Sequence, residues 1–310
     1  MSQFFTTAIL TATVASGIQL AAPFLLAALG ETMGQRSGVI NLGVDGIMLL
    51  GAFGGYWTAL RTGSLALAVV AGLGVGALLG LVTAFVSVTL KAEQGISGIG
   101  VYLFALGFSN LLFLKLVGTP RPIAQLKTIG IPVLDRIPTA GGMLFRHDIL
   151  VYASFLLVPV VAFVLNRTTW GLNIKAAGEN PAAADSLGVS IPKVRYSTVV
   201  VGSALAGLAG VTLLIQVGLF QQNLTQSQGF IAVALVYFGA WRPTGVMAGA
   251  LLYGLTEAVV LSWKGLGIIP LSISDLASTA PAVITVVALL TVARRFRQPA
   301  ALGRPYERGA

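Results

Sequence analysis

Three polar side chains stand inside long apolar stretches of the sequence: Asn41, Asp45 and Glu257. A carboxylate at the centre of a membrane helix costs about 2.5–3.5 kcal/mol on insertion scales, so it normally faces a cavity or a partner. Asn41 and Asp45 are four residues apart, and residues at this spacing share one face of a helix. The three side chains are therefore candidates for the lining of a polar path through an apolar protein.

Asp45 also has a structural interpretation. Its carboxylate could pair with Arg36, or it could accept hydrogen bonds from free N–H groups at the start of a helix. Gly38, Gly43 and Gly46 weaken a continuous helix here, because glycine costs about 1 kcal/mol relative to alanine in a helix interior. We therefore expect a helix break near Asp45, and both interpretations stay open.

Glu257 has two interpretations as well. Only Thr256 and Ser262 relieve the apolar character of the residues around it. The side chain either faces a cavity or lies near the membrane edge and reaches towards Lys264. The nearby lysine favours the second arrangement.

The residue patterns of soluble-enzyme sites are absent from the sequence. There is no Gly-Lys-Ser/Thr phosphate loop, no His-Glu-x-x-His pair and no Gly-x-Ser-x-Gly turn. His147 is the only histidine and there is no cysteine, so a metal centre would lack the three or four ligands that it needs. We expect no catalytic residue, no metal and no cofactor, and any ATP that drives the protein must be bound by another chain.

A different signal lies between residues 178 and 188, which read Gly-Glu-Asn-Pro-Ala-Ala-Ala-Asp-Ser-Leu-Gly. Asn180 is a good N-cap, and Pro181 suits the first helical position. The alanines that follow have the highest helix propensity, and Gly188 suits the left-handed residue after a helix end. The sequence predicts a capped helix of about two turns, roughly 10 Å long. It either docks in a groove of another protein, with Leu187 adding apolar contact, or simply links two spans at the membrane surface.

The elements that hold these residues are predicted to be membrane helices. Hydrophobic residues make up 56% of the 310 positions and charged residues only 9%, against about 25% in a soluble domain. A spanning helix needs about 20 mostly apolar residues. We therefore predict an all-α polytopic transmembrane bundle, a single domain over residues 1–310, with about nine spans and a range of about eight to ten. The apolar stretches are 8–29, 38–60, 65–90, 95–117, 149–166, 198–219, 226–241, 245–262 and 273–293.

Basic residues indicate the side of each connection. The segment 167–197 and the tail 294–310 fall on one side, which is the richer in Lys and Arg, and the loop 118–148 falls on the other. Because connections rich in Lys and Arg stay in the cytoplasm, we place the segment and the tail there and the N-terminus outside. The net charge of +9 is densest in that tail, so we expect no nucleic-acid partner.

Three stretches of the sequence resemble bacterial ABC-transporter permeases for nucleosides and simple sugars, which are similar to the branched-chain amino acid and ribose permeases. The first is 34–46, in which Gln35 stands where that family more commonly has Glu. The second is 177–184 and the third is 229–245. They follow in the order of the family, and together with the hydropathy they cover nearly the whole chain.

The resemblance implies one permease subunit of an importer in the plasma (inner) membrane of a bacterium. Its partners would be a second permease subunit, an ATP-binding subunit and an extracytoplasmic substrate-binding lipoprotein, besides membrane lipid. The short helix would lie in a groove of the ATPase and switch the bundle between outward-open and inward-open states. The residues expected at this contact are Gly178, Glu179, Asn180, Pro181, Ala183, Leu187 and Gly188.

The resemblance also implies a substrate class. The stretch 34–46 is more similar to the nucleoside or purine branch than to the ribose-type branch, so a nucleoside or purine is expected. A simple sugar such as a pentose is the alternative within the family. An ion-coupled secondary transporter that uses Asp45 or Glu257 is a further alternative, because broken helices near an acidic group occur in such proteins too.

Overall fold

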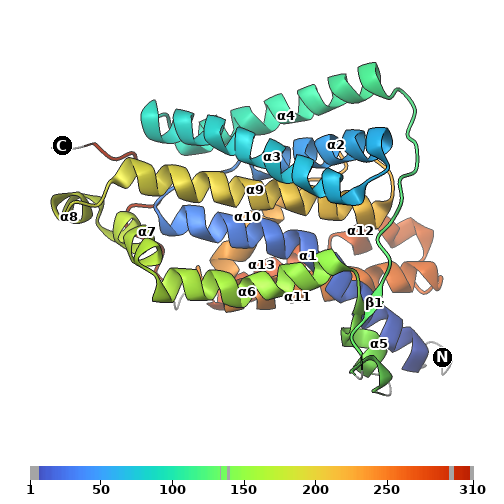
Figure 1. Cartoon of the computed structure of the whole chain (residues 1–310). Helices are drawn as coiled ribbons and strands as arrows, with labels where there is room; N and C mark the ends of the chain where they lie inside the picture. Colours follow the sequence, from blue (N-terminus) through green and yellow to red (C-terminus); the bar gives the residue numbers. More distant parts are fainter. Residues whose placement is uncertain (1–6, 133, 138–139, 293–296, 308–310) are drawn as a thin grey trace.

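The computed structural model describes residues 7–132, 134–137, 140–292 and 297–307. Figure 1 shows the long helices side by side in one bundle. The strands found within the described residues are β1 (Ile129–Gly130) and β2 (Arg146–His147), which pair antiparallel with Ile129 opposite His147. The predicted all-α polytopic bundle is confirmed.

Each apolar stretch of the sequence lies mainly on helix within the described residues. Six helices among the described residues are long and apolar enough to cross a membrane: α1 (Thr7–Arg36), α3 (Leu65–Ala84) with its π-helical extension η2 (Phe85–Thr89), α4 (Gln94–Leu116), α6 (Ile149–Arg167), α9 (Ile191–Val217) and α11 (Pro243–Gly265). Helix α2 (Val44–Thr62) has 19 residues but contains Asp45 and Arg61. The remaining apolar stretches form the shorter helices α10 (Gln228–Phe238), α12 (Ser274–Ser278) and α13 (Ala280–Val292).

Helix α9 forms the centre of the bundle. In its most apolar 18-residue window 78% of the residues are buried, against 17% in α4, so α4 is the peripheral helix. Gly202 of α9 meets Gly30 of α1, and Gly207 meets Gly72 of α3, where any side chain would overlap the neighbouring backbone. Small residues at such crossings let helix backbones approach closely.

The two ends of the bundle carry different connections. Helices α7 (Thr169–Glu179) and α8 (Pro181–Ser186) lie at the same end as the C-terminal segment 297–307, and α1 starts at the opposite end (Figure 1). That opposite end also carries β1, β2 and α5 (Ala140–Leu144). The segment 167–197 and the tail are therefore on one side, as the charges predicted, and we refer to this side as the α8 end.

Helix α10 is too short to cross a membrane. Its 11 residues rise about 16 Å. Its first turn lies beside Asp45 in α2, and the turn after its last residue places Trp241 beside Arg36, the last residue of α1. Helix α10 therefore starts inside the bundle and ends near the α8 end, as a half-length element.

Candidate coupling site and polar path

The end of α1 is tied to the turn between α10 and α11. The Arg36 Nε–H donates to the Trp241 carbonyl oxygen at 3.0 Å, and Gln35 Oε1 accepts a hydrogen bond from the Trp241 indole N–H at 2.8 Å. Ala240 and Trp241 have φ values of 52° and 56°, which non-glycine residues rarely adopt. Two hydrogen bonds from the stretch 34–46 thus hold a strained turn within the stretch 229–245.

Asn41 belongs to a buried network at the break between α1 and α2. Its backbone N–H donates to Glu31 Oε1 at 3.0 Å, and the same oxygen accepts from Gln35 Nε2 at 3.0 Å. The Asn41 Oδ1 accepts from the Gly43 N–H at 2.9 Å, a local bond typical of turns. Because α1 ends at Arg36 and α2 begins only at Val44, the expected helix break is present, and Asn41 does not share a helix face with Asp45.

Asp45 joins two helix starts inside the bundle. It lies in the first turn of α2 and is 0% exposed. Its Oδ1 accepts from the Gly229 N–H at 2.8 Å, and its Oδ2 accepts from the Thr225 hydroxyl at 3.0 Å. Because Gly229 is in the first turn of α10, the carboxylate lies near the positive ends of two helix dipoles, which stabilise negative charge. Asp45 thus accepts a hydrogen bond from an N–H group at a helix start, which is one of the arrangements expected for a structural role. Contact between Asp45 and a substrate stays a prediction.

Glu257 does not pair with Lys264. Two helical turns separate the residues, roughly 10 Å along the axis, and no ion pair joins them among the described residues. The Lys264 ammonium instead donates to the hydroxyl of Ser278 in α12. The favoured interpretation of Glu257 is therefore wrong, and its Oε2 is buried without a hydrogen-bond partner.

The predicted short helix, α8, forms with the predicted caps. Asn180 Oδ1 accepts from the Ala183 N–H at 3.0 Å, and Gly188 has a φ of 88°. The preceding helix α7 was not anticipated, and it buries Ile174 and Ala177 against the bundle. The capped helix therefore projects from a base that is packed on the core.

Most of the residues expected at the partner contact are accessible. Leu187 is 86% exposed, more than any other large hydrophobic side chain among the described residues. Pro181 is partly exposed, and the exposed members of the set are Glu179, Asn180, Ala183, Leu187 and Gly188. These residues form an accessible surface at the tip of the bundle.

Gly178 is placed differently from the rest of that set. It is buried, and its carbonyl oxygen accepts a hydrogen bond from the Ala301 N–H at 2.8 Å. A side chain at Gly178 would overlap the Arg36 carbonyl oxygen. Gly178 therefore fastens α7 to the end of α1 and does not face outward with α8.

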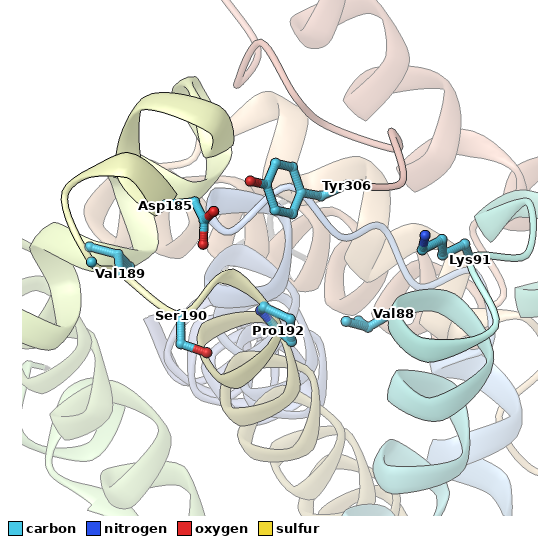
Figure 2. Close-up of a pocket in the computed structure, with 8 residues that line it drawn as sticks. Val88, Lys91, Asp185, Val189, Ser190, Pro192 and Tyr306 are labelled. Carbon is cyan, nitrogen blue, oxygen red and sulfur yellow. The ribbon is translucent and has the colours of Figure 1, made fainter. Parts of the chain in front are cut away.

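A groove of about 470 Å³ lies beside α8. Figure 2 shows Asp185, Val189 and Ser190 on one side, Lys91 and Val88 on the other, and Tyr306 above Pro192 between them. Next to it, the Lys91 Nζ pairs with Glu307 Oε1 at 2.8 Å, and this lysine holds the pKa of the exposed Glu307 carboxyl below its ordinary value. The C-terminal segment thus forms one wall of a groove next to the predicted coupling helix.

Metal ligands do not gather in the part of the chain that the structure describes. There, no group of three or more His, Cys, Asp or Glu side chains could hold a metal ion. His147 instead has its Nε2 at 3.0 Å from the Met143 carbonyl oxygen, and its burial lowers its pKa. His147 therefore packs between α5 and α6.

The sequence matches a family of transport proteins. The family described as "Branched-chain amino acid transport system / permease component" matches residues 13–292. The chain belongs to this permease family. Six helices among its described residues are long and apolar enough to cross a membrane, so the permease is a multi-pass membrane protein. Permeases of this kind work with an ATP-binding subunit and a substrate-binding partner and are not themselves enzymes.

Three relatives are similar to the permease over most of its length. A protein of Haloferax volcanii with the provisional name glucose ABC transporter permease is 38% identical over 85% of the chain and 80% of its own length. A guanosine ABC transporter permease of Bacillus subtilis is 32% identical over 97% of the chain and 98% of its own length. A nucleoside ABC transporter permease of Lactococcus lactis is 32% identical over 94% of the chain and 96% of its own length. No solved structure matches the chain.

The permease also contains a buried guanidinium that the sequence did not single out. Arg195 is 1% exposed, and α9 begins at Ile191, earlier than the apolar stretch suggested. Its Nε–H donates to the Ser37 carbonyl oxygen at 3.2 Å and its Nη1 to the Arg304 carbonyl oxygen at 3.0 Å, while Nη2 is buried without a partner. Arg195 thus ties the C-terminal segment to the break after α1.

The basic tail was expected as a cytoplasmic flank of the last span. Its described part, 297–307, packs on the bundle, where the Gly303 N–H donates to the Gly38 carbonyl oxygen at 3.0 Å, and its cytoplasmic location stays a prediction. Arg294 and Arg295 lie outside the described residues. Nothing local in the sequence marks this packing, because the partners are backbone carbonyl groups far away along the chain.

Proposed function

We propose that this permease is the transmembrane subunit of an ATP-driven ABC importer for nucleosides or purines. Helix α8 carries this proposal, because it is a capped helix that projects from the bundle with Leu187 86% exposed. Its base is fastened to the end of α1 through Gly178 and to the C-terminal segment through Ala301. A partner that binds α8 can therefore move α7 and the end of α1 together.

The coupling follows from two states with different contacts. A partner shifts a conformational equilibrium only as far as its contacts differ between the states. The end of α1 holds the α10–α11 turn through Arg36 and Trp241, so a displacement of α7 reaches the half-length helix α10 directly. The ATPase would thereby bias the bundle between outward-open and inward-open arrangements.

The partners and the location follow from the same proposal. The permease pairs with a second permease subunit, an ATP-binding subunit and an extracytoplasmic substrate-binding lipoprotein in the plasma (inner) membrane of a bacterium. The whole chain acts as one permease domain, with 167–197 as the coupling segment and the tail 294–310 on the cytoplasmic side.

The relatives support a nucleoside as substrate. The two named for guanosine and for nucleosides match 97% and 94% of the chain. A sugar is the second candidate, because the relative named for glucose has the higher identity, 38%. Of the three path candidates, Asn41 and Asp45 use their side-chain oxygens within the protein, whereas Glu257 Oε2 has no partner.

Uptake by the reconstituted importer tests the proposal. Proteoliposomes with the permease pair, the ATPase and a loaded binding protein should take up labelled guanosine only with ATP and a competent ATPase. Uptake of glucose without guanosine would select the second candidate. Uptake that persists with a disabled ATPase, in a proton or sodium gradient, would overturn the importer in favour of an ion-coupled transporter.

A further inference from the structure

A crevice of about 300 Å³ lies between α1, α9 and α11, at the lower end of the volumes of small-molecule sites. Its polar lining comes from Ser16 and Gln19 in the first half of α1, Gln216 near the end of α9, and Ser262 near the end of α11. These helix ends lie opposite the α8 end (Figure 1). The crevice is therefore on the side where a binding protein would deliver a substrate.

Hydrogen bonds within the protein fix the orientation of two of these groups. The Gln216 Nε2 donates to the Gln19 carbonyl oxygen at 2.9 Å, and the Ser262 hydroxyl lies 2.9 Å from the Thr13 hydroxyl. The first bond fixes which side of the amide carries the acceptor. The Gln216 Oε1 is buried without a hydrogen-bond partner, and a buried acceptor in that condition is costly.

Glu257 adds a second acceptor of the same kind one turn deeper. It precedes Leu261, which lines the crevice, by four residues, and this spacing places both on one face of α11. Its Oε2 is also buried without a partner. No Lys or Arg lines the crevice. The two side-chain atoms without a partner, Gln216 Oε1 and Glu257 Oε2, are both hydrogen-bond acceptors.

We propose that this crevice is the outer substrate subsite, where Gln216 Oε1 and Glu257 Oε2 accept hydrogen bonds from N–H or O–H groups of a neutral polar solute. The assignment rests on the proposed importer function. Both oxygens are shielded in the arrangement described, so α1, α9 and α11 must part before a solute reaches them. A solute that then satisfies both acceptors favours the parted arrangement, as coupling requires. Nucleosides and sugars both carry such donors.

Uptake by two variants tests the subsite. Gln216→Leu and Glu257→Leu should each lower the uptake rate about tenfold at saturating loaded binding protein, because each removes one hydrogen bond to the solute. Asn110→Leu is the matched control, since Asn110 Oδ1 on α4 is also buried without a partner but does not line the crevice. The control should transport at the wild-type rate. Copurification of all subunits establishes that each variant is folded.

A thiol probe tests occupancy independently of transport rate. The chain has no cysteine, so Ser16→Cys provides a single site for a water-soluble maleimide in the assembled complex. Guanosine or glucose, delivered by the loaded binding protein, should slow the labelling, and whichever solute does so identifies the class. Wild-type uptake in both leucine variants would overturn the subsite. So would a labelling rate that neither solute changes, in a complex that transports one of them. A wild-type complex that transports neither solute would overturn the importer function instead.

Discussion

Removing the carboxylate of Asp45 should release the start of α10. Asp45→Ala leaves the Gly229 N–H and the Thr225 hydroxyl without the oxygens that they contact at 2.8 and 3.0 Å. Each buried polar group left unpaired costs about 1–3 kcal/mol, and the rotatable hydroxyl can find a carbonyl more easily than the fixed N–H. We therefore expect the free energy of unfolding to fall by about 2–4 kcal/mol in Asp45→Ala. Asp45→Asn keeps one acceptor and should lose about half as much.

Thermal unfolding of the purified permease in detergent, followed by circular dichroism, measures the stability of each variant relative to the wild type. Asp275→Ala is the control, because Asp275 is exposed in the first turn of α12, and surface substitutions usually change stability by less than about 0.5 kcal/mol. The expected order of unfolding temperatures is wild type and control highest, then Asp45→Asn, then Asp45→Ala. If Asp45→Ala unfolds with the wild type and yet abolishes uptake, Asp45 acts on the substrate path and does not anchor α10.

Two further predictions concern the α8 end. Gly178→Ala should destabilise the permease by about 1–3 kcal/mol, because the added methyl group overpacks against the Arg36 carbonyl oxygen. Gly100→Ala is the control and should not destabilise it, since no atom lies within 4 Å of the added carbon. Equal unfolding temperatures of both variants and the wild type would contradict the contact at Gly178. The Lys91–Glu307 pair should hold the C-terminal segment in a pH-dependent way. Because Lys91 lowers the pKa of Glu307, the pair is complete above the ordinary carboxyl pKa and is lost as pH falls through the lowered pKa. Protease cleavage of the C-terminal segment should rise as the pH falls through this range in the wild type, and Lys91→Gln should remove this pH dependence. If cleavage of Lys91→Gln depends on pH as in the wild type, the pair does not hold the segment.

Local structure could be predicted from the sequence where the signals are local. The caps of α8 depend on Asn180, Pro181 and Gly188, all within a few residues of the helix that they bound. The apolar stretch 226–241 is short for a full span, which leaves a half-length helix or a tilted one open, and α10 is the half-length one. The helical bundle followed from composition in the same way.

Contacts between distant segments could not be predicted. Asp45 finds its partners at Thr225 and Gly229, on an element that returns into the bundle only after α9. Arg195 binds carbonyl oxygens at Ser37 and Arg304, and any residue type can supply a carbonyl, so no sequence pattern marks it. Helical spacing placed Asn41 with Asp45, but the chain between α1 and α2 is not helical.

A substitution on the exposed surface at α8 tests the central claim, which is that a partner ATPase drives this permease through that helix. Leu187→Asp places a charge where a groove of the partner should bury an apolar side chain, and the loss of an anchoring contact at the centre of an interface costs at least about tenfold in coupling, or about 1.4 kcal/mol. The measurement is ATP-dependent uptake by the reconstituted importer, with Leu187→Met as the control that keeps the apolar contact. We predict that Leu187→Asp melts at the wild-type temperature, because the side chain is 86% exposed, and loses at least about tenfold in uptake, while Leu187→Met transports normally. Wild-type uptake by Leu187→Asp would contradict the account.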